Sequence, residues 1–598
     1  MNLVWHPPTP GIALPCPICD APGPHPVLVQ AGLHTLLRCQ GCTVCFFRER
    51  IRPDYENEQG AALFEQLSLE QTAGLHRMIR FLYTIDDDAM DSLLDVGCGF
   101  GFPVDCAAKV LGWRAVGIDP SHHARAGAAL LHADIRKEYL TAQTDLGQPY
   151  SLVLASEVIE HIPDPYPFMQ VLRRWLKPGG TLVLTTPDAD ALTPATNPAA
   201  VLAMLSVGAH LILFSARSME LYLRRAGFRH VHVTSSQDTL MVHASDRKLR
   251  FRDDADARHR SGYQAYLRQL VDTAAPGTPL WNGAAGRLFA LDADREPLEP
   301  LFALWHRIVT AWRDRFGIDV QRLRLPPILP ELAHQAPGGT SLAQMAGAQP
   351  FNLGIVLCNR AVLESRVPGR TPEQVIAFAR AAYAHAVQTR RVMQSEAMID
   401  LELKAAAWRA RLMMLDSLVE LAPELEVDLL MGLAQPSPGS LHDRIDPPPD
   451  VVINRIAGPF AHLVHANQYD AAERLEPWMR DLDAVCAATA ADPMRMYHAL
   501  FTIGVLRMNH LGQPAAARAA FQRIGDEAQR RLADPAGAEL AAHFLAVAAD
   551  HVRMAEARLP PQPEPLPEPQ PQPEPQPEPQ TAPAVRRRRK ALARAAGV

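Results

Sequence analysis

Four cysteines near the start of the chain have the spacing of metal ligands. Cys16 and Cys19 form one C-x₂-C pair, and Cys39 and Cys42 form a second pair, separated from the first by 19 residues. Two thiolates at this spacing can bind the same metal ion, and two such pairs complete a tetrahedral S₄ site. We therefore expect a structural zinc ion with no open coordination position. A metal-free remnant of such a site is the alternative.

The residues around these pairs fit a zinc ribbon over residues 1–50. The run Val-Leu-Val at 27–29 lies between the two pairs and is typical of a strand in a β-hairpin. Cys45 follows Cys42 by three residues, but residues 43–47 have the pattern of an apolar strand that leaves the site. Cys45 is therefore not expected to bind the ion.

A glycine-rich turn and a downstream acid form a second constellation. An apolar strand at 92–96 leads into Gly-Cys-Gly-Phe-Gly at 97–101 and then into a helix at 104–111. Glycines at such a turn let the backbone approach a ligand and expose its amides. The next strand, at 114–118, ends in Asp119, where a carboxylate can accept hydrogen bonds from both hydroxyls of a ribose. The pattern Gly-x-Gly-x-Gly disfavours a dinucleotide-dependent dehydrogenase, whose loop is Gly-x-Gly-x-x-Gly.

Two further strands complete an α/β pattern over residues 51–245. One spans 150–155 and is followed by Ser-Glu-Val-Ile-Glu-His at 156–161. The other spans 181–186 and follows a Leu-Lys-Pro-Gly-Gly turn at 176–180. Short apolar strands that alternate with helical stretches predict a Rossmann-like sheet of parallel strands.

These segments, in this order, closely resemble class I SAM-dependent methyltransferases, particularly those that act on small molecules and bacterial glycan precursors. The resemblance covers about 90–240 and includes Leu-Asp-Val-Gly-Cys-Gly-Phe-Gly, Gly-Ile-Asp-Pro, Ser-Glu-Val-Ile-Glu-His-Ile-Pro-Asp-Pro, Leu-Lys-Pro-Gly-Gly and Arg-Arg-Ala-Gly-Phe. It implies that Asp119 holds the ribose of SAM and that Asp95 orders the loop and the amino group of the cofactor. Asp134 or Glu138 would meet the adenine. The remaining cofactor-binding residues would be Gly97, Cys98, Gly99, Gly101 and Ser156.

Two histidines are candidates for the catalytic base. A hydroxyl acceptor must lose its proton during methyl transfer, and imidazole suits that task near neutral pH. His161 follows the strand at 150–155, and His210 precedes Leu-Ile-Leu-Phe-Ser at 211–215, in a stretch that closes the acceptor pocket in relatives. We expect His210 to be the base; a structural role for either histidine is the alternative.

Glu157, Glu160 and His161 form an E-x-x-E-H pattern. It resembles that of ubiquinone-pathway O-methyltransferases, in which a divalent cation is implicated. Three such ligands within one helical turn can hold an ion, but relatives without a known metal also carry the pattern. Whether this chain binds a cation here is left open.

The arrangement of a four-cysteine ribbon in front of this fold resembles that of sugar methyltransferases and, separately, that of an rRNA guanine methyltransferase. The net charge of −6 and the lack of a basic stripe favour the former and make nucleic acid an unlikely partner. The predicted activity is methyl transfer to a sugar or glycan-precursor hydroxyl. An aromatic or quinone-like acceptor is the first alternative, and a non-catalytic scaffold that works through its helical region is the second.

Residues 250–558 have the composition and apolar spacing of helices and predict an all-α region. Gly458 is followed by Ala471 and Leu475, and Gly504 by Ala517 and Phe521, at the same spacings. Small residues that let two helices approach closely are typical of tetratricopeptide-like units, although generic hairpins fit equally. Such a region could bind a protein partner.

The two ends of the chain carry no targeting or membrane pattern. Residues 1–8 have neither a basic start nor an apolar core, and no apolar run is long enough for a membrane span, so a cytoplasmic protein is expected. Residues 559–598 are a Pro/Glu/Gln-rich linker with a basic tip at 586–590, which predicts a disordered tail. The tip could contact nucleic acid, an acidic partner or anionic lipid, or only keep the chain soluble.

Overall fold

The computed structural model describes residues 3–6, 11–50, 55, 61–71, 75–196, 198–236, 238–295, 297–328, 340–395, 401–421, 449–533 and 537–560. The chain divides into two compact units, Met1–Leu506 and Arg507–Val598. The tail predicted at 559–598 lies outside the described residues from 561 onward. The boundaries predicted at 50, 245 and 558 stay predictions, since this division falls elsewhere.

A seven-stranded sheet forms the centre of the first unit and confirms the Rossmann-like fold. Its strand order is β11-β12-β9-β8-β5-β6-β7, with β5 to β9 parallel. Strand β12 is antiparallel to its neighbours β9 and β11, so β11 runs in the same direction as β5 to β9. The strands are β5 (Ser92–Val96), β6 (Arg114–Ile118), β7 (Ile135–Arg136), β8 (Tyr150–Ser156), β9 (Leu176–Pro187), β11 (His230–Ser236) and β12 (Thr239–Ser245). The order reverses at β5, and ligands of such sheets bind where the strands beside that point end.

Two details of this sheet differ from the sequence prediction. Strand β7 was not predicted, because two residues are too short to show an alternating pattern. The turn predicted at 176–180 is wrong: β9 already begins at Leu176, which pairs with Tyr150. Gly179 adopts a φ of 74°, so these residues bend within the strand rather than before it.

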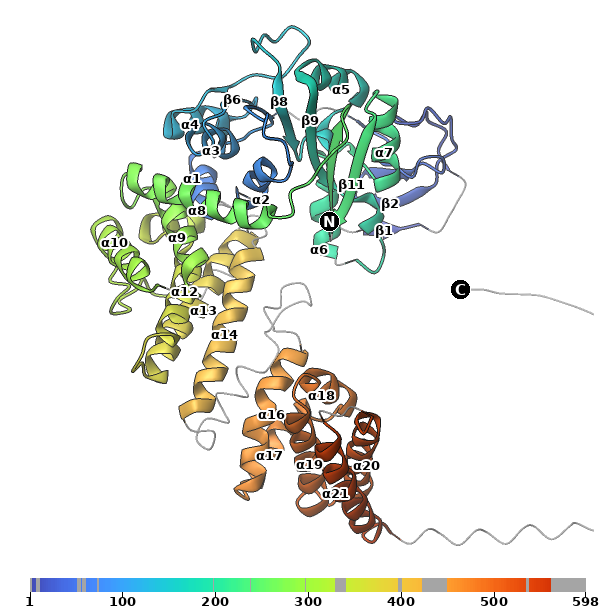
Figure 1. Cartoon of the computed structure of the whole chain (residues 1–598), viewed down its shortest axis with the longest axis vertical. Helices are drawn as coiled ribbons and strands as arrows, with labels where there is room; N and C mark the ends of the chain where they lie inside the picture. Colours follow the sequence, from blue (N-terminus) through green and yellow to red (C-terminus); the bar gives the residue numbers. More distant parts are fainter. Residues whose placement is uncertain are drawn as a thin grey trace, which may run out of the picture. The chain divides into compact units, whose positions relative to one another are not determined.

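The two faces of the sheet are covered by different parts of the chain. Successive side chains point to opposite faces of a strand. Leu93, Leu152 and Val183 join a core with α3 (Phe102–Lys109), α4 (His122–Leu131) and the helices after 250. Leu94, Val153 and Leu182 instead join a core with α5 (Pro165–Arg174), α7 (Ala216–Arg225) and the cysteine cluster. Figure 1 shows α3 and α4 on one side of the strands and α7 on the other.

The N-terminal residues form a small antiparallel sheet that is completed by a strand from far along the chain. Its order is β1-β2-β3-β4-β10. The predicted hairpin is present as β2 (Val27–Ala31) and β3 (His34–Arg38), next to β1 (Leu3–Trp5) and β4 (Cys45–Phe47). The fifth strand, β10 (Ile212–Leu213), follows α6 (Pro198–Leu205) and pairs with Phe46 and Cys45. The ribbon and the methyltransferase-like fold therefore share one sheet.

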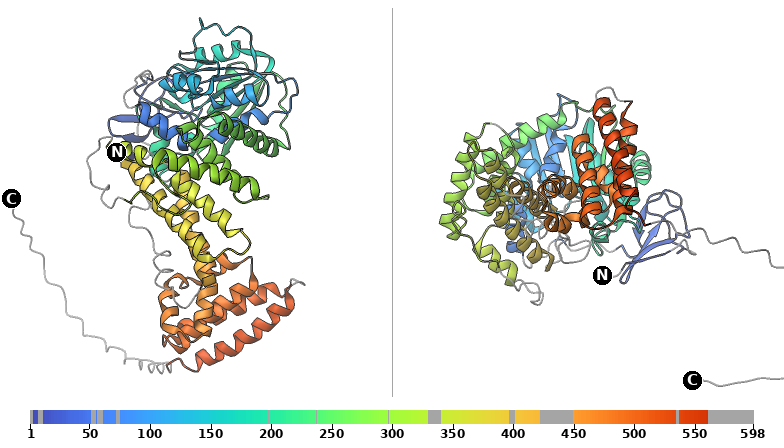
Figure 2. Two further views of the ribbon diagram at one scale, coloured as in Figure 1. Left: turned by 90° about the vertical axis from the view of Figure 1, so that its left-hand side faces the viewer. Right: turned by 90° about the horizontal axis from the view of Figure 1, so that it is seen from below.

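The region after 250 is helical, as predicted, and its first helices pack on the central sheet. They are α8 (Ala255–Thr273), α9 (Pro279–Asp292), α10 (Glu299–Phe316), α11 (Thr340–Ala348), α12 (Leu353–Ser365), α13 (Pro372–Ser395) and α14 (Leu401–Leu421). Helices α12, α13 and α14 pack side by side (Figure 2). In the described part of the chain, no helix is both long and apolar enough to cross a membrane.

The later helices follow one another with short connections. Helix α16 (Pro449–His465) is followed by α17 (Tyr469–Leu475) and α18 (Leu482–Thr489), and α19 (Pro493–Asn509) by α20 (Pro514–Arg531) and α21 (Ala538–Glu556). A Cβ added at Gly458 would meet no atom within 4 Å, so this glycine is not needed for close helix packing. Helix α16 packs against α17 and α18, and α20 packs against α21, while the tetratricopeptide-like nature of this region stays a prediction.

Two short helices precede the central sheet, and the first is held by the helical region. These are α1 (Ala61–Gln71) and α2 (Leu75–Arg80). On α1, the Glu70 carboxylate accepts hydrogen bonds from Asn282 Nδ2 at 2.9 Å and from the backbone N–H of Phe351 at 2.7 Å. Gln71 Nε2 donates to the carbonyl of Phe351 at 3.0 Å. These bonds fix α1 against α9 and the start of α12.

The buried Glu70 predicts a distinct pH dependence of stability. Burial raises the pKa of this 1 % exposed carboxyl from 4.5 to about 7. The unfolded chain therefore loses this proton first, and the free energy of unfolding should fall as pH rises from 4.5 to 7, by about 3 kcal/mol at most. Urea unfolding at pH 5 and pH 7.5 should show this loss in the wild type and not in Glu70→Gln. An equal pH dependence in the two proteins would contradict the assignment.

Candidate active site

A cavity of about 880 Å³ opens where the central strands β5, β6 and β8 end. Gly97 follows β5, Asp119 follows β6 and Glu157 follows β8, and all three line the cavity. This is the position at which open α/β sheets bind ligands, beside the reversal of strand order at β5. The cavity therefore occupies the predicted cofactor position.

The glycine loop has the backbone shape that its sequence requires. Gly97 and Gly101 adopt φ angles of 74° and 76°. A Cβ at Gly97 would lie 2.4 Å from Val158 Cγ2, and one at Gly101 would lie 2.3 Å from Ile135 Cδ1. A Cβ at Gly99 would meet nothing within 4 Å. The first and last glycines are thus needed for close packing, while the middle one leaves open space beside the backbone.

The Asp119 carboxylate is anchored to this loop. Its two oxygens accept hydrogen bonds from the backbone N–H of Gly99 at 2.9 Å and of Ser121 at 2.7 Å. Asp95 lies behind the loop, and its burial, with the charge of Asp119, raises the pKa of its carboxyl well above the ordinary value. Of the predicted cofactor residues, Gly97 and Asp119 line the cavity. The other predicted residues are not among the described lining residues: Asp95, Cys98, Gly99, Gly101 and Ser156.

The structure separates the two candidates for the adenine contact. Glu138 lines the cavity together with Tyr139. Asp134 precedes β7, and its backbone carbonyl accepts a hydrogen bond from the N–H of Gly117 within the sheet. Glu138 is therefore the better placed of the two.

Glu160, His161 and His210 converge on one point. One ligand atom from each lies within 4.8 Å of the others. Nδ1 of His161 donates to the carbonyl of Ala209 at 3.0 Å, and Nδ1 of His210 donates to the carbonyl of Met204 at 2.6 Å. A carbonyl can only accept, so each Nδ1 carries the proton and each Nε2 keeps a lone pair. His161 lines the cavity; His210 is not among its described lining residues.

The carboxylate of Glu160 has an unused oxygen at this point. Glu160 is fully buried, and its Oε2 accepts a hydrogen bond from Thr186 Oγ1 at 3.0 Å. Its Oε1 lies 3.8 Å from His161 Nε2 and has no hydrogen-bond partner within the described ranges. Burial raises the pKa of Glu160, and it lowers the pKa of His161 and that of His210, the latter to about 4. Both rings are therefore neutral near pH 7.

The sequence did not indicate that His210 would join this cluster. The predicted E-x-x-E-H set grouped Glu157 with Glu160 and His161, whereas the structure brings His210 to the latter two. The backbone N–H of Leu211 donates to the carbonyl of Glu160 at 2.7 Å, and β10 then pairs with the ribbon strand β4. No local spacing encodes this contact between distant segments.

Tyr55 is a cavity residue that the sequence analysis missed. Its hydroxyl lies 2.7 Å from Nδ1 of His161, and the two rings meet edge to face at 5.6 Å. It also lines the cavity. A single tyrosine ahead of a helix carries no recognisable motif, so only the fold identifies it.

The four predicted zinc ligands lie together. The Sγ atoms of Cys16 and Cys42 are 3.6 Å apart, and those of Cys19 and Cys39 are 3.5 Å apart. Tetrahedral Zn–S bonds of ~2.3 Å place sulfurs ~3.8 Å apart, so this cluster fits the ion. Cys45 is buried in a different core, as expected for a residue outside the site.

Loss of one of these thiolates should release the ion. We expect one zinc per chain in anaerobically purified protein and almost none in Cys16→Ser or Cys39→Ser, with the first 50 residues unfolding because their core is small. The buried but uninvolved Cys45→Ala is the matched control and should keep its zinc. Elemental analysis and limited proteolysis measure both effects. A metal-free wild type would overturn the zinc assignment.

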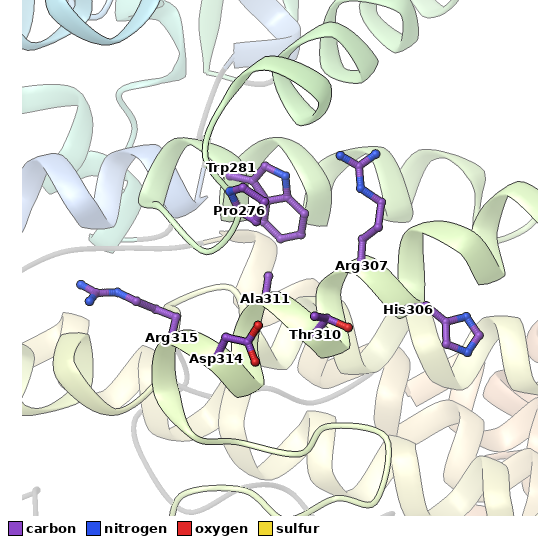
Figure 3. Close-up of a pocket in the computed structure, with 8 residues that line it drawn as sticks. All are labelled: Pro276, Trp281, His306, Arg307, Thr310, Ala311, Asp314 and Arg315. Carbon is purple, nitrogen blue, oxygen red and sulfur yellow. The ribbon is translucent and has the colours of Figure 1, made fainter.

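A second cavity, of about 610 Å³, lies in the helical region between α9 and α10. Figure 3 shows that Trp281 comes from α9 and that Arg307 and Arg315 extend from distant points of α10. Arg307 is already paired with Asp272 at 2.9 Å. Within the described lining, no group of side chains here resembles the acid and imidazole cluster of the first cavity.

Comparisons with known proteins agree with this geometry. A family model described as "Methyltransferase domain" matches residues 64–233. An uncharacterised 37.1 kDa protein of a Streptomyces fradiae transposon is 29 % identical over 189 residues, which are 30 % of this chain and 50 % of that protein. The ubiquinone biosynthesis O-methyltransferase of Cereibacter sphaeroides is 33 % identical over 103 residues, which are 16 % of this chain and 40 % of that enzyme. The chain thus spans half or less of these relatives' length.

A solved SAM-dependent methyltransferase of Thermotoga maritima is 15 % identical, with a TM-score of 0.25, and covers 32 % of this chain and 97 % of its own. The sheet order, the glycine loop with Asp119 and the family match over 64–233 agree on one assignment. This part of the chain is a class I SAM-dependent methyltransferase domain.

Proposed function

We propose that the chain binds SAM in the 880 Å³ cavity and transfers its methyl group to a hydroxyl of the acceptor. One observation carries this proposal: a single cavity is lined both by the cofactor residues Gly97 and Asp119 and by His161, whose Nε2 keeps a lone pair. Asp119 would accept hydrogen bonds from the ribose, Glu138 would meet the adenine amine, and the loop at 97–101 would hold the methionine portion.

For this reaction the chain must position the acceptor hydroxyl against the methyl group of SAM and remove the proton of that hydroxyl. The acceptor oxygen attacks the methyl carbon in line with the departing sulfur, a C–O bond forms, and the C–S bond breaks to leave S-adenosylhomocysteine. Nε2 of His161 takes the hydroxyl proton. We assign this role to His161 rather than His210 because His161 lines the cavity, while His210 packs against it with ring centroids 4.8 Å apart.

The resemblance to ubiquinone-pathway enzymes raises the question of a divalent cation. One carboxylate oxygen without a partner among the described residues and two imidazole nitrogens, from Glu160, His161 and His210, are a donor set that fits such an ion. When bound, it would lower the pKa of the acceptor hydroxyl. The rings are oriented for either task, since their Nδ1 atoms are held by backbone carbonyls.

We propose a sugar or glycan-precursor hydroxyl as the acceptor. The ribbon in front of the domain supports it, as do the polar groups of Tyr55, Glu157 and Asp164 in the cavity, which suit an acceptor with several hydroxyls. The named activity of the Cereibacter sphaeroides relative favours a quinone-like acceptor as the second candidate. The full chain, given SAM with a labelled methyl group, should label one class and not the other. Mass spectrometry then identifies the methylated oxygen.

The same assay tests catalysis against the scaffold alternative. A scaffold would bind SAM weakly or not at all, and would label neither class of acceptor. Calorimetry with SAM and with S-adenosylhomocysteine therefore precedes the acceptor panel. No measurable binding of either compound would overturn the proposed function.

A further inference from the structure

A further group of metal-ligand side chains lies where α1 meets α4. Glu65 comes from α1, and His122 and His123 are the first two residues of α4. One ligand atom from each lies within 4.8 Å of the other two, and all three side chains are half-buried. This cluster is separate from the ribbon cysteines and from Glu160, His161 and His210.

The imidazole nitrogens of this cluster are unsatisfied. Both ring nitrogens of His122 and Nδ1 of His123 are shielded from solvent and have no hydrogen-bond partner in the portions of the chain that the structure describes. Buried polar atoms are nearly always paired, and an unbound ion is one recognised reason for an exception. The contrast with His161 and His210 is clear, because each of those rings has a carbonyl on Nδ1.

We propose that Glu65, His122 and His123 bind a divalent transition-metal ion such as zinc or cobalt. Two imidazole nitrogens and one carboxylate oxygen are a set that such ions prefer, and water would complete the coordination. Ligand bonds of ~2.1 Å keep any two ligand atoms within ~4.2 Å of each other. The observed limit of 4.8 Å is close to this value, so the three ligand atoms already lie near the spacing that such an ion requires.

The position of this site couples it to the cofactor cavity. His123 lines that cavity, and α4 begins three residues after Asp119, whose carboxylate accepts the N–H of Ser121. Helix α1 is held at its other end by Glu70. An ion at the new site would thus fasten the start of α4 to a helix that is already anchored in the helical region. The proposal concerns metal binding and does not depend on the acceptor or on methyl transfer.

Cobalt binding to the full-length zinc-loaded protein tests the proposal. We use Glu160→Gln as the background, because it weakens the cluster of Glu160, His161 and His210. In this background, Co²⁺ should still bind, and it should bind at least 10-fold more weakly after Glu65→Gln or His122→Asn. His132→Asn changes an exposed histidine at the other end of α4 and should bind Co²⁺ as the background does. Circular dichroism checks that each variant is folded.

X-ray absorption of the bound cobalt provides a measurement that needs no further variant. The spectrum should show imidazole and oxygen ligands. Sulfur ligands would mean that cobalt had displaced the ribbon zinc, and would overturn the proposal. It is also overturned if Glu160→Gln abolishes Co²⁺ binding, or if Glu65→Gln binds Co²⁺ as tightly as its background.

Discussion

Replacing His161 with Ala should lower kcat about 10²–10⁴-fold and leave the affinity for SAM nearly unchanged. His161 lines the cavity, its Nδ1 proton is held by the carbonyl of Ala209, and its Nε2 is free to accept the acceptor proton. Cofactor affinity depends on the glycine loop and Asp119, which the substitution does not touch. Steady-state kinetics with the acceptor found in the panel, together with calorimetry for SAM, separate the two effects.

His210→Ala is the informative comparison for this result. His210 is buried beside His161 and bonded to the carbonyl of Met204, so its loss should lower stability and reduce kcat less than the loss of His161 does. If His210→Ala lowers kcat more than His161→Ala does, His210 is the catalytic base, as the sequence had predicted. Full activity in both single variants would remove the histidine mechanism and leave catalysis by proximity alone.

Replacing Asp119 with Ala should weaken SAM binding by about 2–3 kcal/mol, which is roughly a 10²-fold rise in Kd. The variant lacks the carboxylate and therefore its charge-assisted hydrogen bonds to the ribose. The substitution would also leave the backbone N–H groups of Gly99 and Ser121 without their acceptor, so the loop itself would be less well ordered. Calorimetry with SAM measures the change.

Asp119→Asn tests the same assignment with a side chain of equal size. It keeps one acceptor oxygen but no charge, so its Kd should lie between those of the wild type and Asp119→Ala. A melting temperature close to that of the wild type would show that the loss is local. If SAM affinity is the same in all three proteins, Asp119 does not hold the ribose.

The parts of this fold that could be predicted are those that short-range patterns encode. Strands β5 and β6 were predicted at their observed bounds, because each is a five-residue run closed by a glycine turn or an acid. The ribbon hairpin was predicted because the apolar Val-Leu-Val run lies between the two C-x₂-C pairs. Strand β7 could not be predicted, since its two residues pair with β6 only once the sheet has formed.

The parts of the site that could not be predicted depend on contacts between distant segments. His210 was expected near the acceptor, but its approach to Glu160 depends on β10 pairing with β4. Tyr55 reaches His161 across more than a hundred residues of chain. The anchoring of α1 depends on Glu70 meeting Asn282 and Phe351, which have no local relation to it. Periodicity and motif spacing contain no information about such pairings.

The shared ribbon sheet has a consequence for the order of events during translation. Ile212 follows Phe47 by 165 residues. At a translation rate of 5–20 residues per second, the partner strand β10 is therefore synthesised roughly 10–30 s after β4. During that interval the edge of β4, with Cys45, Phe46 and Phe47, is open to pairing with another nascent chain. The zinc ion that we propose for the four cysteines would hold the ribbon closed while the rest of the domain is made. Cells starved of zinc should therefore accumulate this chain as aggregate, and zinc added after synthesis should not recover it.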